Sequence, residues 1–396
     1  MSHLVDTLRV MDDAVPLTMR QQEWASTMGG HGGGALRRAH ADSDAKIGSA
    51  ELLGRVAREE AEEPLLAPGA TRARGAGNRA LQEEPNEIRT CFERDRDRIL
   101  HGVTAFRRLA GKTQVFIFPD DHQRTRLTHA LEVAQVATGI ARACRLNVTL
   151  TEAIALGHDC GHGPFGHASE DAFTPFVPGG YDHAVWGADV VLEPLNLCTE
   201  TLDGVRNHSW SRPAPQTPEG EVVSWADRIA YVCHDFEDAV RAGIVTPAML
   251  PQSVLERCGD RRSLQLGGFI NAVVGASLAS GEIGMDDSTA EALAQFRTFN
   301  YERIYMRPAS VAQGKAVEKV LMALVEFYAD RPNAMPPKEL AGTGHPIGGS
   351  EAGSDQALRE AVTYVAGMTD RFAISQAMAR LGWEASALPV GLDIGR

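Results

Sequence analysis

The run GHDCGHGPFGH, at residues 157–167, restricts the fold of this chain more than any other feature. Its glycines and its proline end a predicted helix. The adjacent His158 and Asp159 could not share one face of a regular helix, but both can point inward where the helix ends. Eight of the chain's thirteen histidines lie between residues 122 and 234, a clustering that packing alone explains poorly. Because histidine is the commonest metal ligand, the pattern predicts a metal site on a helical framework.

Charge and cysteine usage narrow the class of protein. A formal net charge of −13 at pH 7 argues against non-specific binding to nucleic acid or to an anionic membrane. No apolar run approaches the roughly 20 residues that a membrane-spanning helix needs, and the N-terminal residues lack the pattern of a secretory signal. The six cysteines are scattered, without a C-x-x-C motif, and are interpreted as free thiols. We therefore expect a soluble, cytoplasmic protein without membrane partners.

Composition divides the chain into four segments. Residues 1–85 are rich in Gly, Ala, Arg and Glu and poor in aromatic side chains, so we expect a low-complexity, mobile N-terminal extension with one short helix near residues 49–62. Residues 86–330 carry helical periodicity and form the predicted catalytic core. Pro and Gly crowd residues 331–356, which we interpret as a loop or linker. Helices in residues 357–396 are expected to pack on the core.

The pattern within the core is helical. Apolar side chains recur mostly at steps of three and four residues across residues 92–109, and the following segment repeats this spacing. A further helix is expected to begin at a capping threonine, either Thr149 or Thr151, and a long helix to close at Gly243. The best strand candidate is QVFIF, at 114–118. The predicted fold is mostly α with one short β-hairpin.

Four side chains form the candidate metal-ligand set. His129 lies early on one predicted helix, and Asp227 lies on a later one. His158 and Asp159 stand between them, where the intervening helix ends. Two neutral imidazoles and two carboxylates suit Mn, Fe, Co, Ni or Zn, or Mg with more water ligands. A single histidine on a helix is more often a core or surface residue, but four candidates with a broken helix to aim two of them favour a divalent metal.

A second polar group follows on the same turn and on the helix beyond it. His162, His167 and Glu170 pair imidazoles with a carboxylate, the usual device for proton transfer, in which the carboxylate orients and polarises the ring. The competing interpretation is that either histidine caps a helix or bonds a backbone carbonyl. His183, in GGYDHAVWG, is a further candidate for the same pocket.

One face of a later helix carries candidates for substrate binding. Asp227, Tyr231 and Asp235 stand at i, i+4 and i+8 and therefore share roughly one helix face. A phenol and a carboxylate there could hold a sugar hydroxyl, and Arg228 could reach a phosphate. The alternative is that Tyr231 belongs to the core and Asp235 to the solvated surface. A local excess of arginine before the first ligand, which includes Arg126, suggests polyphosphate binding. Ordinary surface pairing of these arginines is the competing interpretation.

With these residues assembled, the chain resembles the HD superfamily, named for its His…His-Asp…Asp metal set, and within it the deoxyguanosinetriphosphate triphosphohydrolase-like proteins. Five pieces stand in the family's order across residues 88–380, although 245–355 matches only loosely. The pieces are FERDRDRILHGVTAFRRLAGKTQVF, RTRLTHALEVAQVA, ALGHDCGHGPFGHASED, ADRIAYVCHDFEDAVRAG and YVAGMTDRFA. The resemblance implies the HD-domain helical fold.

The resemblance also implies an activity. In the family, a deoxynucleoside triphosphate is cut between the 5′ oxygen and the α-phosphorus, which gives deoxynucleoside and intact triphosphate. A divalent metal, Mg or Mn in the first place and Fe, Co, Ni or Zn otherwise, activates the attacking water. The implied metal ligands are His129, His158, Asp159 and Asp227.

The other candidates receive roles by the same resemblance. His167, oriented by Glu170, protonates the leaving 5′ oxygen, while His162 and Arg126 contact phosphates. The implied deoxyribose contacts are Tyr231 and Asp235. The histidines expected to be structural are His122, His208 and His234.

Family members are commonly homo-oligomers, and several are activated by nucleotides at separate sites, so we expect both properties here. One departure is the run GGYDHAVWGAD, where Ala and Trp occupy the family's Asn and Gln positions, which concerns pocket shape and base preference more than metal chemistry. Two other functions stay open: an HD-type nucleotidase or phosphodiesterase acting on another nucleotide, and a weakly catalytic nucleotide sensor or single-strand nucleic-acid binder. The arginines favour the triphosphohydrolase, and the net charge counts against the binder.

Overall fold

A computed structural model of the chain describes most of its residues. These are residues 16–384 and 388, apart from 27–28, 33–34, 49, 76, 103, 116–122, 337–348 and 385–387. The chain divides into two compact units, Met1–Leu52 and Leu53–Arg396. The described residues of the first form one helix, α2 (Met19–Ser26), and an isolated antiparallel bridge between His31 and Arg38. No side chain of α2 is buried, as its polar sequence predicts.

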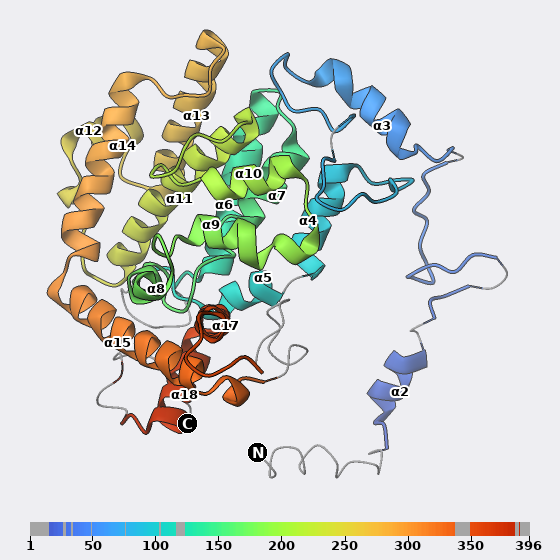
Figure 1. Cartoon of the computed structure of the whole chain (residues 1–396). Coiled ribbons are helices and arrows are strands. Elements are labelled where there is room, and N and C mark those ends of the chain that lie inside the picture. Colours follow the sequence, from blue (N-terminus) through green and yellow to red (C-terminus); the bar gives the residue numbers. More distant parts are fainter. Residues whose placement is uncertain are drawn as a thin grey trace. The chain divides into compact units, whose positions relative to one another are not determined.

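Helices build the second unit, which confirms the predicted mostly-α fold (Figure 1). Its central helices are α4 (Cys91–Gly102), α6 (Arg126–Ala143), α7 (Val148–Gly157) and α11 (Pro218–Arg241). α6 packs on both α7 and α11, and α7 also packs on α4. Side chains with no exposed surface fill the space between them, among them Val133, Ile140, Ile154 and Ile229. Each such side chain contributes roughly 1.5–3 kcal/mol through burial.

Local capping sets the ends of these helices. Thr125 caps α6 in a capping box. Asn147 caps α7 through its side chain, so this helix begins before the expected Thr149 or Thr151, because asparagine is the stronger N-cap residue. Gly243 stands just beyond the end of α11 with a φ of +69°, which confirms its predicted place.

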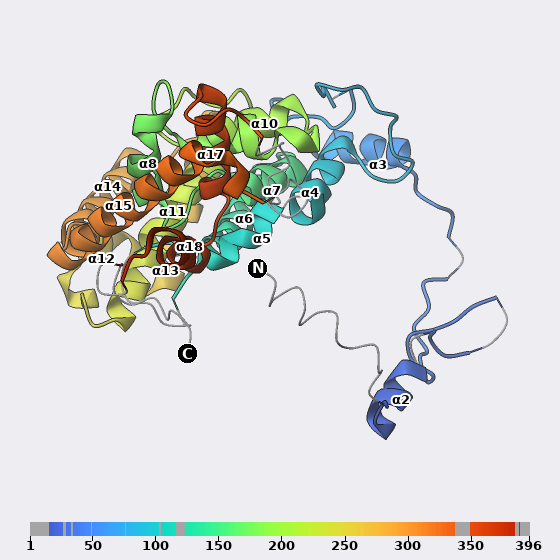
Figure 2. The same cartoon turned by 60° about the horizontal axis from the view of Figure 1, so that its bottom comes forward.

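Further helices pack around the central ones (Figures 1 and 2). The remaining helices are α3 (Arg55–Glu62), α5 (Thr104–Arg108), α8 (His167–Phe173), α9 (His183–Trp186), α10 (Thr199–Asn207), α12 (Gln252–Cys258), α13 (Arg262–Ser280), α14 (Asp287–Asn300), α15 (Pro308–Asp330), α17 (Asp355–Ala366) and α18 (Asp370–Leu381). α13 and α14 pack against α11. α15 packs on α8, α17 and α18, and these helices enclose a second hydrophobic cluster.

Buried polar residues hold the glycine-rich run against the C-terminal helices. Asp370, at the start of α18, accepts a hydrogen bond from the backbone N–H of Phe165 at 2.7 Å. The ammonium of the buried Lys112 donates to the carbonyl oxygen of Ala366 at 2.9 Å and to that of His162. Both contacts place the turn that carries the candidate ligands.

The second unit begins at residue 53 and so includes residues 53–85, which differs from the boundary expected at residue 85. Glu219, fully buried on α11, accepts hydrogen bonds from the backbone and side chain of Thr71 at 3.0 and 2.7 Å. The same carboxylate accepts one from the backbone N–H of Asn147 at 2.9 Å. Hydrogen bonds between polar residues therefore join this segment to the core. Its low aromatic content does not predict these bonds. The helix expected near residues 49–62 forms as α3.

A buried ion pair fastens the same segment to α4, and its loss is expected to destabilise the protein. Asp95, with no exposed surface, lies 2.6 Å from Nη1 of Arg79 and accepts hydrogen bonds from the backbone N–H of Cys198 at 2.9 Å and the hydroxyl of Thr201 at 2.7 Å. Asp95→Asn leaves the guanidinium of Arg79 buried without its counter-charge. We expect the free energy of unfolding to fall by about 3–5 kcal/mol, as measured by urea denaturation.

Asp97→Asn is the matched control for this variant. Asp97 stands two residues further along α4 and pairs with Arg89 at 2.9 Å in a partly exposed position. Its loss should lower the free energy of unfolding by less than about 1 kcal/mol. Equal losses for the two variants would show that burial of the Asp95 pair does not matter.

The expected β-hairpin is not supported by the structure. Gln114 and Val115 lie in a bend, and an isolated antiparallel bridge joins Thr113 to Thr125. Residues 116–118 lie outside the described residues. Nowhere in the described ranges do strands form a sheet.

α13 is the one helix of the described part that is long and apolar enough to cross a membrane by length and composition. The protein buries 22% of this apolar window. A single helix of this kind is weak evidence for a membrane span, since helices of soluble proteins pass the same test.

Candidate active site

The turn between α7 and α8 brings elements distant in the sequence into close approach. A Cβ on Gly161 would lie 2.0 Å from the carbonyl oxygen of His183, at the start of α9. A Cβ on Gly166, which has a φ of +63°, would lie 2.1 Å from Nη2 of Arg126 on α6. Glycine at both positions lets α9 and an arginine of α6 reach the turn.

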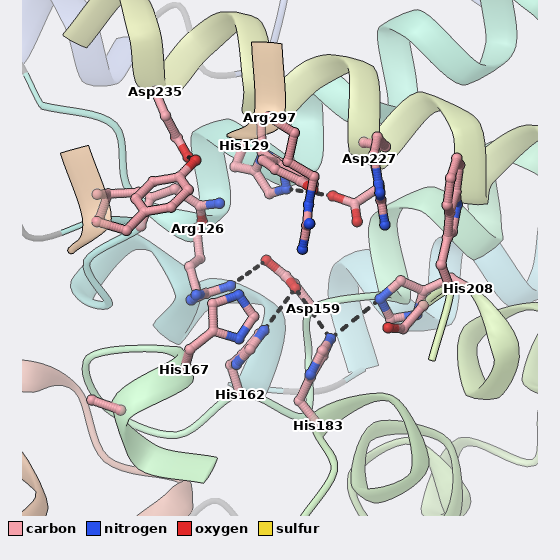
Figure 3. A pocket seen from close by; sticks show the side chains of 18 of the residues that line it. Arg126, His129, Asp159, His162, His167, His183, His208, Asp227, Asp235 and Arg297 are labelled. Atoms are coloured by element: carbon pink, nitrogen blue, oxygen red, sulfur yellow. Dashed lines mark hydrogen bonds and ion pairs between the residues drawn. The ribbon is translucent and has the colours of Figure 1, made fainter. Parts of the chain in front are cut away.

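The candidate metal ligands come from three parts of the chain, and Figure 3 shows the side chains of three of them, His129, Asp159 and Asp227, pointing toward one another. Nε2 of His129, on α6, lies 3.0 Å from Oδ1 of Asp227, on α11. Nε2 of His158 lies 3.7 Å from the same oxygen and 3.5 Å from Oδ1 of Asp159. The two histidines and Asp159 are buried, and Asp227 is partly exposed to the cavity. The structure thus brings the complete candidate set together.

The hydrogen bonds of His158 test whether this set suits a metal. Its Nδ1 donates to the carbonyl oxygen of Ala155 at 2.7 Å, so the neutral ring keeps a lone pair on Nε2. That nitrogen is buried and has no hydrogen-bond partner among the described residues. Burial opposes the ionisation of Asp227, but its hydrogen bond with His129 and the nearby imidazoles outweigh this and lower the pKa of the carboxyl. A lone pair on Nε2 of His158, next to the carboxylates of Asp159 and Asp227, suits a divalent cation that takes nitrogen and oxygen ligands.

Beside the ligand set, imidazoles surround a third carboxylate. Oε1 of Glu170 lies 3.0 Å from Nδ1 of His167 and 2.9 Å from Nδ1 of His183. His162 stacks on His183, and its Nε2 lies 3.2 Å from Oδ1 of Asp159, which joins the two groups. Burial opposes the ionisation of Glu170, but the charge of His183 and the hydrogen bond with His167 outweigh it and lower the pKa of the carboxyl. The side chain of His167 is 77% exposed and lines the cavity.

Three guanidinium groups line the same cavity, which has a volume of about 320 Å³. Nη1 of Arg126 donates to Oδ2 of Asp159 at 2.9 Å, while its Nε and Nη2 are buried without a partner in the described part of the chain. Arg228 lies over the ring of Trp210, 3.7 Å from its centroid, and Arg297, from α14, is the third group. Within the described residues, neither Arg228 nor Arg297 forms an ion pair with a carboxylate. The cavity therefore suits an anionic ligand.

Phenols and one carboxylate form another part of the lining. Tyr231 and Asp235 line the cavity from α11, the helix of Asp227. Oδ2 of Asp235 accepts a hydrogen bond from the hydroxyl of Tyr305 at 2.5 Å. The hydroxyl of Tyr231 accepts one from Nε of Arg297 at 2.8 Å. Burial raises the pKa of Asp235 to about 7.

Known proteins share these features. A family model for the HD domain matches residues 126–232, and a model for a phosphohydrolase-associated domain matches residues 283–379. A deoxyguanosinetriphosphate triphosphohydrolase-like protein of Caldanaerobacter subterraneus subsp. tengcongensis is 42% identical over 323 residues, which cover 80% of this chain and 92% of that protein. A protein of the same name from Desulfatibacillum aliphaticivorans is 38% identical over 340 residues, which cover 80% of this chain and 95% of that protein. The deoxyguanosinetriphosphate triphosphohydrolase-like protein 1 of Deinococcus radiodurans is 35% identical over 368 residues, which cover 80% of this chain and 96% of that protein.

This chain belongs to the deoxyguanosinetriphosphate triphosphohydrolase-like family of HD-domain proteins. Membership makes it a hydrolase of the HD phosphohydrolase class with a divalent-metal site. The HD match contains all four candidate ligands, from His129 to Asp227. The phosphohydrolase-associated match contains Arg297 and Tyr305, so the segment that resembled the family only loosely also contributes to this cavity.

The sequence analysis did not place several lining residues in the site, and four of them have polar or aromatic side chains that bear on its chemistry. They are His208, Trp210, Arg297 and Tyr305. His208 was expected to be structural, but its Nε2 lies 3.2 Å from Nε2 of His183, and the histidine clustering was itself a signal for it. His234 is buried with its Nδ1 3.1 Å from a carboxylate oxygen of Glu132, and it does not line the cavity. His122 lies outside the described residues.

Asp235→Asn is expected to stabilise the metal-free protein above neutral pH. Burial raises the pKa of this carboxyl from 3.8 to about 7, so between these values the folded state binds the proton more tightly than the unfolded state. Stability is therefore lost as the pH rises through this window. The neutral amide removes this loss, which is on the order of 1–4 kcal/mol. Thermal unfolding with a chelator should show a higher Tm for the variant at pH 8 and little gain at pH 4; equal gains at both would exclude titration of Asp235 as the cause.

Proposed function

We propose that this phosphohydrolase converts deoxynucleoside triphosphates, dGTP among them, to deoxynucleoside and triphosphate. The observation that supports the proposal is the set of three guanidinium groups beside the candidate metal ligands. Arg228 and Arg297 form no ion pair with a carboxylate in the described part of the chain. Guanidinium groups that line a cavity and have no carboxylate partner can bind an anion through their N–H groups, and three separated groups match a triphosphate better than a single phosphate. The names of the relatives support dGTP as one substrate.

The proposed metal ligands also position a substrate-binding arginine. A divalent metal held by the four ligands, Mg or Mn in the first place, lowers the pKa of a water molecule and neutralises phosphate charge. Oδ2 of Asp159 holds Nη1 of Arg126 at 2.9 Å, which aims the rest of that guanidinium. Its Nε and Nη2, without partners among the described residues, are free to donate to phosphate oxygens. Arg228 and Arg297 bind the other phosphate groups.

His167 is the proposed donor of the proton to the leaving 5′ oxygen. Its Nδ1 hydrogen bonds with Oε1 of Glu170 at 3.0 Å, so Nε2 is the nitrogen that can meet the substrate. The carboxylate orients the ring and stabilises the imidazolium that donates. His183 contacts the same oxygen at 2.9 Å and helps to fix the carboxylate. His162, buried beside Asp159, is placed to contact a phosphate.

The phenols and Asp235 are proposed to hold the deoxyribose. Asp235 and Tyr305 are hydrogen bonded to each other at 2.5 Å, so they present one continuous polar edge to a sugar hydroxyl. Tyr231 stands one turn before Asp235 on α11 and adds a ring face. A rigid wall of this kind can accept the 3′ hydroxyl while leaving no room for a 2′ hydroxyl, which would favour deoxyribonucleotides over ribonucleotides.

Product analysis tests this function. The purified protein is incubated with dGTP, the other deoxynucleoside triphosphates and GTP, with Mg or Mn, and the products are separated by chromatography. We expect deoxynucleoside and intact triphosphate, with little turnover of GTP. Orthophosphate or pyrophosphate as the first product would contradict the proposal. Cleavage of a monophosphate or cyclic nucleotide instead would support the nucleotidase or phosphodiesterase.

Homo-oligomer formation and activation by a nucleotide are further parts of the proposal, and they rest on the family resemblance. Assays of single and mixed nucleotides separate activation from simple turnover. Activity that appears only in mixtures would support a separate activating site, and equal activity with single substrates would count against it. Sedimentation of the purified protein gives its oligomeric state.

A further inference from the structure

Three imidazole nitrogens converge on one carboxylate oxygen at the edge of the candidate active site. The oxygen is Oε1 of Glu170. Nδ1 atoms of His183, His167 and His162 lie 2.9, 3.0 and 3.6 Å from it. Nδ1 of His162 is buried and has no hydrogen-bond partner among the described residues. Oε1 therefore forms hydrogen bonds with His167 and His183, while Nδ1 of His162 lies beside it without a hydrogen bond in the described part of the chain.

These four residues, the His–Glu cluster, have the spacing of a cation site. Their donor atoms all lie within 4.8 Å of one another. Ligands bound to one tetrahedral zinc at roughly 2.0–2.1 Å lie roughly 3.3 Å apart, and the separations of 2.9–3.6 Å from Oε1 bracket this value. His167 is largely exposed, so an ion can enter from the cavity. Three imidazoles and one carboxylate are a ligand set that zinc accepts.

The opposite nitrogens of the two buried imidazoles already have partners that suit a metal-bound ring. Nε2 of His162 lies 3.2 Å from Oδ1 of Asp159, so it can donate there and keep a lone pair on Nδ1. Nε2 of His183 lies 3.2 Å from Nε2 of His208. Nδ1 of His208 donates to the carbonyl oxygen of Val205 at 2.7 Å, so its Nε2 accepts and holds the proton of His183 on the outer nitrogen. Metal-binding histidines usually donate their other N–H to such a partner.

We propose that the His–Glu cluster is a second cation site, which takes a borderline divalent cation such as Zn²⁺ in addition to the metal at the four candidate ligands. Binding of the ion displaces the Nδ1 protons of His167 and His183 to solvent, and metal–ligand bonds replace their hydrogen bonds to Glu170. Because His167 and Glu170 are then both ligands, they can no longer transfer a proton, and the ion inhibits hydrolysis. The inhibitory effect rests on the proposed function, whereas the binding of the ion does not.

Counting bound zinc tests the site without an activity assay. The full chain is dialysed against Zn²⁺, and the ions bound per chain are measured by mass spectrometry. We expect two for the wild type, one for His167→Gln and one for Asp227→Asn, which removes a ligand of the other site. His101→Gln, an exposed histidine outside both sites, is the control and should keep two. Because His167 is exposed, its replacement should not unfold the chain.

Two outcomes of this experiment would overturn the second site. One is a single bound zinc in the wild type, and the other is an unchanged count in His167→Gln. Glu170→Gln offers an independent check, since it keeps the size of the side chain but removes its charge. It should also bind one zinc, and a count of two would argue against the carboxylate as a ligand.

The inhibitory effect needs a second measurement. Protein loaded with Mn²⁺ is titrated with Zn²⁺ while dGTP turnover and the electron paramagnetic resonance signal of bound Mn²⁺ are followed. We expect turnover to fall at least ten-fold while the Mn²⁺ stays bound. Loss of Mn²⁺ in step with turnover would place the zinc in the other site and overturn the inhibition proposed here. If the protein hydrolyses no nucleotide but binds two zinc ions, the proposed function fails and the second site stands.

Discussion

Asp227→Asn is expected to abolish hydrolysis together with metal binding at the four candidate ligands. Oδ1 of Asp227 lies 3.0 Å from Nε2 of His129 and 3.7 Å from Nε2 of His158, so this oxygen faces both candidate imidazole ligands. Asparagine keeps the size of the side chain but removes the negative charge that favours a divalent cation. We expect kcat/KM for dGTP to fall roughly 10³-fold or more, which corresponds to about 4 kcal/mol of lost transition-state stabilisation.

Glu221→Gln is the matched control for this prediction. Glu221 lies on α11, the helix of Asp227, but it does not line the cavity. Its replacement should change kcat/KM by less than about two-fold. Bound metal is measured by emission spectroscopy in both variants, and circular dichroism confirms that each is folded. An Asp227→Asn protein that keeps its metal and its activity would remove Asp227 from the ligand set.

Local patterns explain why much of the framework and the ligand candidates could be predicted from the sequence. The periodicity of α4 and α6 and the φ of +69° at Gly243 follow from residues within one helix or its end. His158 and Asp159 were found because the glycines beside them break a helix. Even here neighbouring residues compete, since Asn147 rather than a threonine caps α7.

Contacts between distant segments explain what the sequence analysis missed. Arg297 and Tyr305 stand more than sixty residues after Asp235, and no spacing rule links α14 to α11 across that distance. Arg297 is placed by the packing of α14 on α11, and Tyr305 lies in the π-helical turn, Tyr301–Tyr305, that follows α14. His208 carried a weak signal through the histidine clustering, but its contact with His183 depends on how α10 meets α9.

The N-terminal boundary shows a different limit of composition. Residues 53–85 have few aromatic side chains, so their apolar surface alone predicts little order. Their attachment comes instead from the ion pair of Arg79 with Asp95 and from the hydrogen bonds of Thr71 with Glu219. In each pair one partner is far from the other in the sequence or lies within a helix, so residue composition alone does not predict the contact.

His167→Gln is expected to lower kcat for dGTP roughly 10²–10⁴-fold, the usual contribution of a positioned general acid. Because the side chain is 77% exposed and lies outside the four-ligand set, KM and the metal at that set should change little. The same variant should lose much less activity with p-nitrophenyl triphosphate, whose leaving group needs no proton. Glu170→Gln leaves the imidazole present but without its carboxylate partner at 3.0 Å, so its kcat for dGTP should lie between those of the wild type and His167→Gln. Equal losses on both substrates would mean that His167 positions the substrate and does not protonate the leaving oxygen.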